Sequence, residues 1–142
     1  MKKFLMLMLA VFLIVPIVKA QAADIPNFKR VAGDSVTDGK RSNKTKGYHV
    51  YTYVPLEYNT SFAEQYVALL QKRGLTLIEH KETELKNEID FWIVSYIDEW
   101  LFNYKNHQVI FSLFRRHGYE NLTKVDMYFS VKVPDALTYE ED

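Results

Sequence analysis

The chain has 142 residues, carries 18 basic and 18 acidic side chains, and contains no cysteine. The lack of cysteine excludes disulfides, a thiol nucleophile, a thiolate metal site and covalently attached haem. The balanced charge argues against a nucleic-acid partner, because proteins that bind nucleic acid concentrate basic residues on one surface. No motif indicates a cofactor, and none is predicted.

The first 22 residues have the organisation of a secretory signal peptide. Lys2 and Lys3 precede an apolar run of 15 residues, 4–18, and Ala20-Gln21-Ala22 places small residues where a signal peptidase cleaves. The run is shorter than the ~20 residues of a membrane-spanning helix, and a retained membrane anchor is the alternative. We therefore predict an exported bacterial protein, periplasmic or extracellular after cleavage near Ala22, with no stable membrane anchor.

Cleavage after Ala22 leaves 120 residues, enough for one domain with a single hydrophobic core. Cleavage after Ala20 is a competing position. The leader holds three of the 18 basic residues and no acid, so the mature chain has 15 basic and 18 acidic residues, a net charge of −3. This modest charge predicts no strong electrostatic field.

Residues 23–46 are polar and rich in turn formers, with one short strand expected within residues 28–36. Four basic residues cluster in this segment: Lys40, Arg41, Lys44 and Lys46. The cluster is either a solvated loop or a contact to an anionic envelope surface.

The run Gly33-Asp34-Ser35-Val36-Thr37-Asp38-Gly39 resembles the first sequence block of the GDSL, or SGNH, esterases and lipases. In that family the serine of this block is the nucleophile and follows the first strand of a doubly wound sheet, so the resemblance implies a nucleophile at Ser35. The family's closing Asp-x-x-His is missing, because no aspartate lies three residues before any of the histidines. A serine without an activating base is a weak nucleophile. The alternative is a turn rich in glycine, aspartate and serine.

A strand, a helix and a second strand are predicted next. Residues 48–54 alternate as a strand that ends at Pro55. Residues 61–73 have the apolar spacing of a helix, with Glu64 three residues after Ser61 as in a capping box. Residues 75–80 read as a strand.

The remaining segments predict a meander. Residues 81–87 are a charged connection, and residues 89–97 form a third strand that is apolar on both faces. Residues 98–116 permit two interpretations. One is a turn at Asp98-Glu99 followed by two strands, 100–104 and 108–116, around Lys105-Asn106-His107; the other is a helix capped by Asp98. Aromatic and β-branched residues favour the strands. Residues 122–133 alternate as a last strand, and the acidic end of the chain is expected to fray.

These elements predict an α+β fold: one amphipathic helix packed on a curved antiparallel sheet, in the order strand, helix, strand and then meander. The predicted organisation is a signal peptide (1–22), a polar N-terminal segment (23–46), a single α+β domain (47–134) and an acidic tail (135–142).

The candidate binding site is an aromatic face shared by two strands, if those strands are neighbours. Tyrosine and tryptophan are rigid, amphipathic and enriched at binding hot spots. The face is either core, packed against the N-terminal segment or residues 100–104, or a protein–protein or homodimer surface, or a pocket for an apolar or aromatic ligand. Its members are His49, Tyr51, Tyr53, Trp92, Val94 and Tyr96.

Two clusters of ionisable residues contain side-chain types that occur in chemical sites. His80, Glu82 and Glu84 would share one side of a longer second strand and offer ligands to a divalent metal. A solvated connection explains these charged residues better, and no metal site is predicted. Asp98 and Glu99 are adjacent, so on a strand they point to opposite faces and do not form a catalytic pair.

The sequence therefore predicts an exported, small, non-catalytic binding domain that acts through a protein or cell-envelope partner, with a homodimer as one form of that contact. A carrier of a small apolar ligand, held in a cavity between helix and sheet, is the alternative. A serine esterase at Ser35 is the third.

Overall fold

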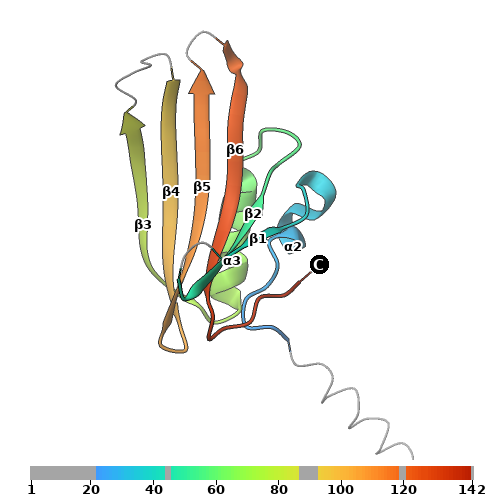
Figure 1. Ribbon diagram of the computed structural model, residues 1–142, viewed down its shortest axis with the longest axis vertical. Helices are drawn as coiled ribbons and strands as arrows, with labels where there is room; N and C mark the ends of the chain where they lie inside the picture. Colours follow the sequence, from blue (N-terminus) through green and yellow to red (C-terminus); the bar gives the residue numbers. More distant parts are fainter. Residues whose placement is uncertain (1–21, 44–45, 87–92, 119–120, 142) are drawn as a thin grey trace, which may run out of the picture.

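The computed structural model describes residues 22–43, 46–86, 93–118 and 121–141 (Figure 1). The predicted signal peptide up to Gln21 and Lys44 of the basic cluster lie outside the described residues. The elements in chain order are α2 (Lys29–Ala32), the 3-10 helix η1 (Gly33–Ser35), β1 (Lys40–Ser42), β2 (Tyr48–Tyr53), α3 (Ser61–Lys72), β3 (Thr76–Lys86), β4 (Ile93–Tyr104), β5 (His107–Gly118) and β6 (Asn121–Pro134).

The strands form one open antiparallel sheet of six strands in the order β1-β2-β6-β5-β4-β3. β3 to β6 are a meander in which each strand pairs with the next along the chain. β2 pairs with β6, so the first long strand lies beside the last one. The expectation of helices combined with an antiparallel sheet is confirmed at this level: the protein is mostly β with short helices.

The strand interpretation of residues 98–116 is confirmed, but the predicted turn at Asp98-Glu99 is wrong. β4 runs through both residues, because Asp98 pairs with Glu82 on one side and Leu113 on the other. The connection expected at Lys105-Asn106-His107 is present as the turn between β4 and β5, where Lys105 and Asn106 have φ values of 48° and 64°. Positive φ at both central residues is typical of the two-residue turns that match the twist of a hairpin.

β3 continues to Lys86, through residues for which a charged connection was predicted. Lys81 pairs with Glu99, and the ladder with β4 extends to Lys86 opposite Val94. Glutamate and lysine are poor strand formers on average, but strand propensity depends on position. On an edge strand these residues face water and hinder pairing with other chains.

The strand expected within residues 28–36 is wrong, because these residues form α2 and η1. Ile25 and Phe28 are fully buried, and Ile25 forms a β-bridge with Tyr139, which is also buried. The packed unit therefore includes residues before 47 and after 134. The few apolar residues of these segments are too widely spaced to show a period, and only tertiary contact reveals their burial.

α3 is present where the sequence predicted a helix, and it buries Ala63, Tyr66 and Leu70. Phe28 lies at the centre of the core. Its ring centroid lies 4.7 Å from that of Phe129 and 5.2 Å from those of Tyr53 and Tyr66. Such ring pairs contribute about 0.5–1.5 kcal/mol each beyond their burial. The core therefore lies between α2 and α3 on one side and the sheet on the other.

Candidate binding surfaces

The described members of the predicted aromatic face lie on two strands, β2 and β4, that are not neighbours in the sheet. β2 carries His49, Tyr51 and Tyr53, and β6 and β5 separate it from β4. Tyr96 lies on β4, only the backbone is described for Val94, and Trp92 lies outside the described residues. The premise that the two strands are neighbours is wrong, because the meander brings its last strand beside β2. A binding role for these residues stays a prediction.

Tyr51 and Tyr53 are both buried. The Tyr53 ring packs on Phe28, and the Tyr51 ring stacks on that of Tyr139 with a centroid distance of 4.0 Å. Both side chains therefore contact the chain segments that precede and follow the sheet. The packing of Tyr53 on Phe28 agrees with the interpretation as core against the N-terminal segment, whereas Tyr51 packs on the C-terminal segment.

His49 and Tyr96 lie in polar surroundings. His49 Nε2 lies 2.8 Å from an Asp135 oxygen, and its Nδ1 lies 2.6 Å from Asn43 Oδ1. The Tyr96 ring lies under the Arg115 guanidinium at 5.4 Å. Each side chain is therefore engaged by its own local partners.

Tyr51, Tyr53 and Tyr139 line an open pocket of about 300 Å³, which we call the tyrosine pocket. Its other lining residues are Asn27, Gly39, Arg41 and Glu141. They come from the N-terminal segment, β1, β2 and the C-terminal segment. Sequence reasoning missed this pocket because it assigned residues 23–46 and 135–142 to segments outside the domain.

The polar groups at the floor of the tyrosine pocket bond to one another. The hydroxyls of Tyr53 and Tyr139 lie 2.5 Å apart, the Tyr139 hydroxyl accepts the Phe28 N–H at 2.9 Å, and Tyr53 donates to Asn27 Oδ1 at 3.3 Å. Burial raises the pKa of Tyr139, and that of Tyr66 behind it, well above the ordinary value for a phenol. These tyrosines are therefore neutral and act as uncharged hydrogen-bonding groups.

A second polar group, the Asp98 cluster, lies on β3, β4 and β5. Asp98 is buried, and its two oxygens contact Arg115 Nη2 at 3.3 Å and His80 Nε2 at 3.2 Å. The imidazole of His80 stacks on Trp100 at 4.4 Å. A buried carboxylate requires such a compensating charge, and the cluster therefore ties three strands together.

His80, Glu82 and Glu84 do share one face, because β3 continues past residue 80. Glu82 lies 3.7 Å from Arg115, and His80 contacts Asp98. Within the described residues, no three or more His, Asp or Glu side chains are arranged to hold a metal ion. His80 belongs to the Asp98 cluster, and Glu82 lies at the margin of that cluster.

β6 extends beyond the end of β2, so its N-terminal part has no partner in β2. The last pair is Tyr53 with Phe129, whereas β6 begins at Asn121. In the part of the chain that the structure describes, residues 125–128 pair with β5 alone. A strand paired on one side exposes N–H and C=O groups on the other. We call residues 125–128 the open edge of β6.

One hollow lies beside the open edge of β6, and a second lies on the other side of the loop after β2. The first, of about 310 Å³, lies between residues 54–58 and the pair Met127 and Tyr128. The second, of about 400 Å³, extends to Ser35 and Phe62. Leu56, Glu57 and Tyr58 line both hollows. The loop after β2 is therefore a ridge between two adjacent depressions.

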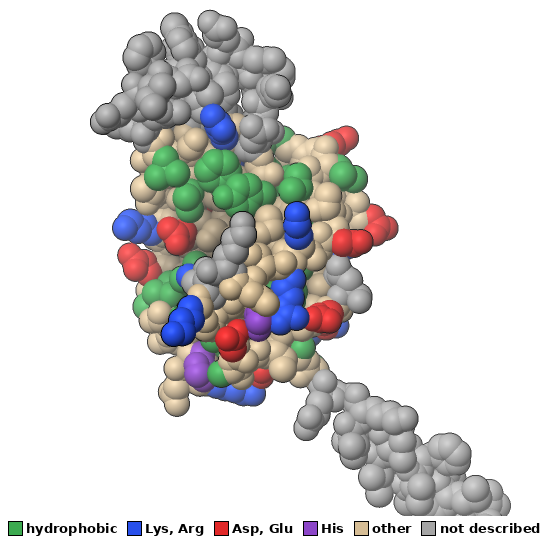
Figure 2. Space-filling view, viewed as in Figure 1, with side chains coloured by type: hydrophobic (Ala, Val, Ile, Leu, Met, Phe, Trp, Pro, Cys, Tyr) green, Lys and Arg blue, Asp and Glu red, His purple; other side chains and the backbone are tan. Residues whose placement is uncertain are grey.

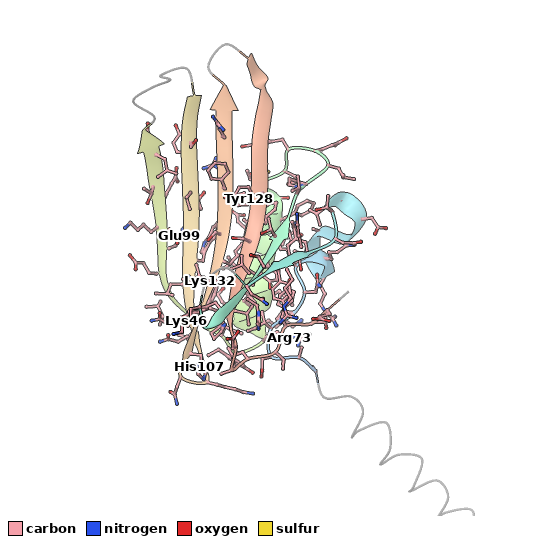
Figure 3. All side chains as sticks on the ribbon, in the orientation of Figure 1. Lys46, Arg73, Glu99, His107, Tyr128 and Lys132 are labelled. Atoms are coloured by element: carbon pink, nitrogen blue, oxygen red, sulfur yellow. The ribbon has the colours of Figure 1, made fainter. Side chains whose placement is uncertain are left out.

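Large apolar side chains are exposed around these hollows. The exposed fractions are 70% for Leu56, 53% for Tyr58, 47% for Val54 and 38% for Tyr128. Tyr128, labelled on β6 in Figure 3, stacks on Phe114 of β5 at 4.8 Å. Figure 2 shows hydrophobic side chains gathered in a band across the upper part of the visible face. Contiguous exposed apolar surface of this kind marks interaction sites.

The charge around the two hollows has one sign. Asp34 lines one hollow and Glu57 lines both, whereas neither hollow has a basic lining residue. The surface is therefore apolar with an acidic margin, and it favours an apolar occupant that carries positive charge.

Ser35, the serine of the GDSL-like block, ends η1 and is exposed. Its carbonyl accepts the Leu56 N–H at 2.9 Å, and no histidine lines the hollow that it borders. The antiparallel sheet also differs from the doubly wound sheet that the resemblance implies. The block therefore forms a turn that fixes the loop after β2 against the N-terminal segment.

A wide polar hollow of about 930 Å³ lies around the turn between β4 and β5, near His107 in Figure 3. Its two aromatic residues are engaged by lysines: Lys132 Nζ lies 4.7 Å from the Tyr48 ring, and Lys105 Nζ lies 5.2 Å from the Tyr104 ring. We assign no ligand to this hollow.

Rings fill the space between α3 and the sheet. Tyr66 of α3 contacts Phe111 of β5 at 4.9 Å, and both are fully buried together with Phe28. No observation there favours a carrier cavity. Among the described residues, no helix has the length and apolar character to cross a membrane.

Comparison of the chain with protein-family models, with curated proteins and with solved structures finds no match.

Proposed function

We propose that this protein is an exported, non-catalytic binding domain whose protein partner adds an extended segment to the open edge of β6. The observation that carries the proposal is the coincidence of an unpaired strand edge with an apolar hollow, between residues 54–58 and Met127 and Tyr128, and with a second hollow across the loop after β2. In strand addition, main-chain hydrogen bonds supply affinity and pockets for alternate side chains supply specificity. Both requirements are met side by side at residues 54–58 and 125–128.

The charge at this surface specifies the chemistry of the partner. Asp34 and Glu57 line the hollows without a basic neighbour among the lining residues. A segment that alternates apolar residues with lysine or arginine would place apolar side chains in the hollows and cations beside these carboxylates. The mature chain also has a net charge of −3, which favours the approach of a basic segment.

Export is part of the proposal and rests on the leader-like residues 1–22. The finer description of the fold, one amphipathic helix packed on a curved sheet, is also part of the proposal. The burial of Ala63, Tyr66 and Leu70 along α3 supports that description.

The test uses a fluorescent, end-blocked peptide of alternating lysine and valine, with fluorescence anisotropy as the readout on the mature protein. We expect Leu56→Lys and Tyr128→Lys each to weaken binding by about tenfold. Each change removes an apolar contact and introduces a cation that repels the basic peptide. Ile78→Lys is the matched control, since Ile78 is also an exposed apolar residue, at 52%, but lies on β3. It should leave binding unchanged.

Two peptide controls separate strand addition from charge attraction. A peptide with glutamate in place of lysine should bind more weakly, and one methylated at alternate backbone nitrogens should not bind. Equal binding of the methylated peptide, or equal affinities of the wild type and both hollow variants, would contradict the proposal. Sedimentation of the protein alone reports whether a second copy, rather than another protein, occupies the edge.

A further inference from the structure

The tyrosine pocket has no role in the proposed function, since it shares no lining residue with the two hollows. Its wall is built by close contact. A Cβ on Gly39 would lie 2.7 Å from the Tyr53 hydroxyl oxygen, so only glycine lets the residue before β1 approach that ring so closely. Its floor is the bonded set of Tyr53, Tyr139 and Asn27, which are all buried. The pocket is therefore preformed rather than dependent on loop closure.

The rim of the pocket carries two opposite charges. Glu141 is positioned by the residue before it, because Glu140 accepts two hydrogen bonds from the Arg30 guanidinium and donates its backbone N–H to Ile25. Arg41 projects from β1 and contacts the His49 ring at 3.1 Å. Among the described residues, Arg41 and Glu141 form no salt bridge with each other or with another side chain.

The charges of Arg41 and Glu141 both act on the Tyr51 hydroxyl. Burial raises the pKa of the Tyr51 hydroxyl, Arg41 lowers this pKa and Glu141 raises it further. A cation and an anion thus border one ring without neutralising each other. A ligand that carries both opposite charges would satisfy them together, whereas a simple cation or anion would satisfy only one.

We propose that the tyrosine pocket binds a small zwitterion, with its carboxylate on Arg41, its ammonium on Glu141 and its apolar part against Tyr51. A guanidinium binds a carboxylate through two parallel hydrogen bonds, which gives direction as well as strength. The volume of about 300 Å³ is at the lower limit of ligand pockets and matches a molecule the size of an amino acid or a dipeptide. This site is independent of the proposed partner surface.

Isothermal titration of the mature protein with L-phenylalanine tests the proposal, since its ring can stack on Tyr51. N-acetyl-phenylalanine lacks the ammonium, and phenylalanine amide lacks the carboxylate. Each should bind about tenfold more weakly than phenylalanine. L-alanyl-L-phenylalanine separates the charges further, so its affinity relative to phenylalanine distinguishes a short peptide from a free amino acid as the ligand.

Two variants assign the charges. Arg41→Gln should abolish the difference in affinity between phenylalanine and its amide. Glu141→Gln should abolish the difference in affinity between phenylalanine and its N-acetyl form. Lys40→Gln, a neighbouring change on β1 outside the pocket, should alter neither difference.

Equal affinities for the free and blocked forms, or no binding of either zwitterion at millimolar concentration, overturns the proposal. Arg41→Gln should leave binding of the lysine–valine peptide intact, so this test and that of the proposed function fail independently.

Discussion

The two ends of the sheet are stabilised in different ways. At the covered end, α2 and α3 pack on the strands, and the buried groups are rings such as Phe28, Tyr66 and Phe129. At the projecting end, β3 to β6 extend beyond the helices (Figure 1), and Arg115 pairs with carboxylates of Asp98 and Glu82. Asp98 lies at the boundary between the two ends.

The packed rings at the covered end exclude water and fill the space between α3 and the sheet, so this end fixes the fold. At the projecting end, an ion pair fixes the strands without burying every apolar group. Tyr128 and Leu56 can therefore remain exposed there, where a partner would meet them. Substitutions at the two ends should differ accordingly.

The largest effect is expected at the covered end. Phe28→Ala removes the ring that contacts Tyr53, Tyr66 and Phe129, and should lower the free energy of unfolding by about 3–5 kcal/mol. Urea unfolding followed by circular dichroism measures this loss. A loss below about 1 kcal/mol would mean that the core does not depend on this ring.

A smaller effect is expected at the boundary. Asp98→Ala leaves Arg115 partly buried without its close partner and should cost about 2–3 kcal/mol in the same measurement. Adding Arg115→Met should recover part of this loss, because no unpaired charge then remains. Strictly additive losses in the double variant would contradict the coupling.

The pH dependence tests how the chain ends are attached. The hydrogen bond from Arg30 lowers the pKa of Glu140 from its ordinary value of 4.5, and that from Lys105 lowers the pKa of Asp24 from 3.8. Because the folded-state pKa values are lower than the unfolded ones, the stability from these pairs is complete above the unfolded values and is lost as the pH falls through the folded ones.

Glu140→Gln should therefore reduce the acid dependence of the unfolding midpoint below about pH 5. Thermal unfolding between neutral pH and pH 3 measures this change, with Glu57→Gln as a control at an exposed position. An unchanged acid profile in Glu140→Gln would show that the Arg30 pair does not hold the C-terminal segment.

The smallest effect is expected at the exposed surface of the projecting end. Leu56→Lys should change the free energy of unfolding by less than about 0.5 kcal/mol, because most of the side chain already faces water. Urea unfolding alongside the peptide-binding assay measures both properties. A loss of several kcal/mol would assign Leu56 to the core and remove it from the partner surface.

Local pattern determined several elements of this fold. Residues 61–73 have helical spacing and a closing glycine, and α3 forms there. Residues 122–133 alternate, and β6 forms there. In both segments the local preference and the final packing agree, so a sequence window contains enough information. The aromatic content of residues 98–116 likewise favoured strands over a helix.

Tertiary structure decided what depends on contacts between distant residues. Glu82 and Glu84 extend β3 because β4 offers a ladder, and Asp98 stays within a strand because β3 and β5 pair with it on both sides. Ile25 and Tyr139 meet across almost the whole chain, and no local pattern encodes that pairing. The tyrosine pocket and the open edge of β6 arise in the same way, from the order of strands in the sheet. The sequence by itself determined which residues are apolar, aromatic or charged; the sheet order, which the long-range pairing of β2 with β6 sets, decided which of them face one another.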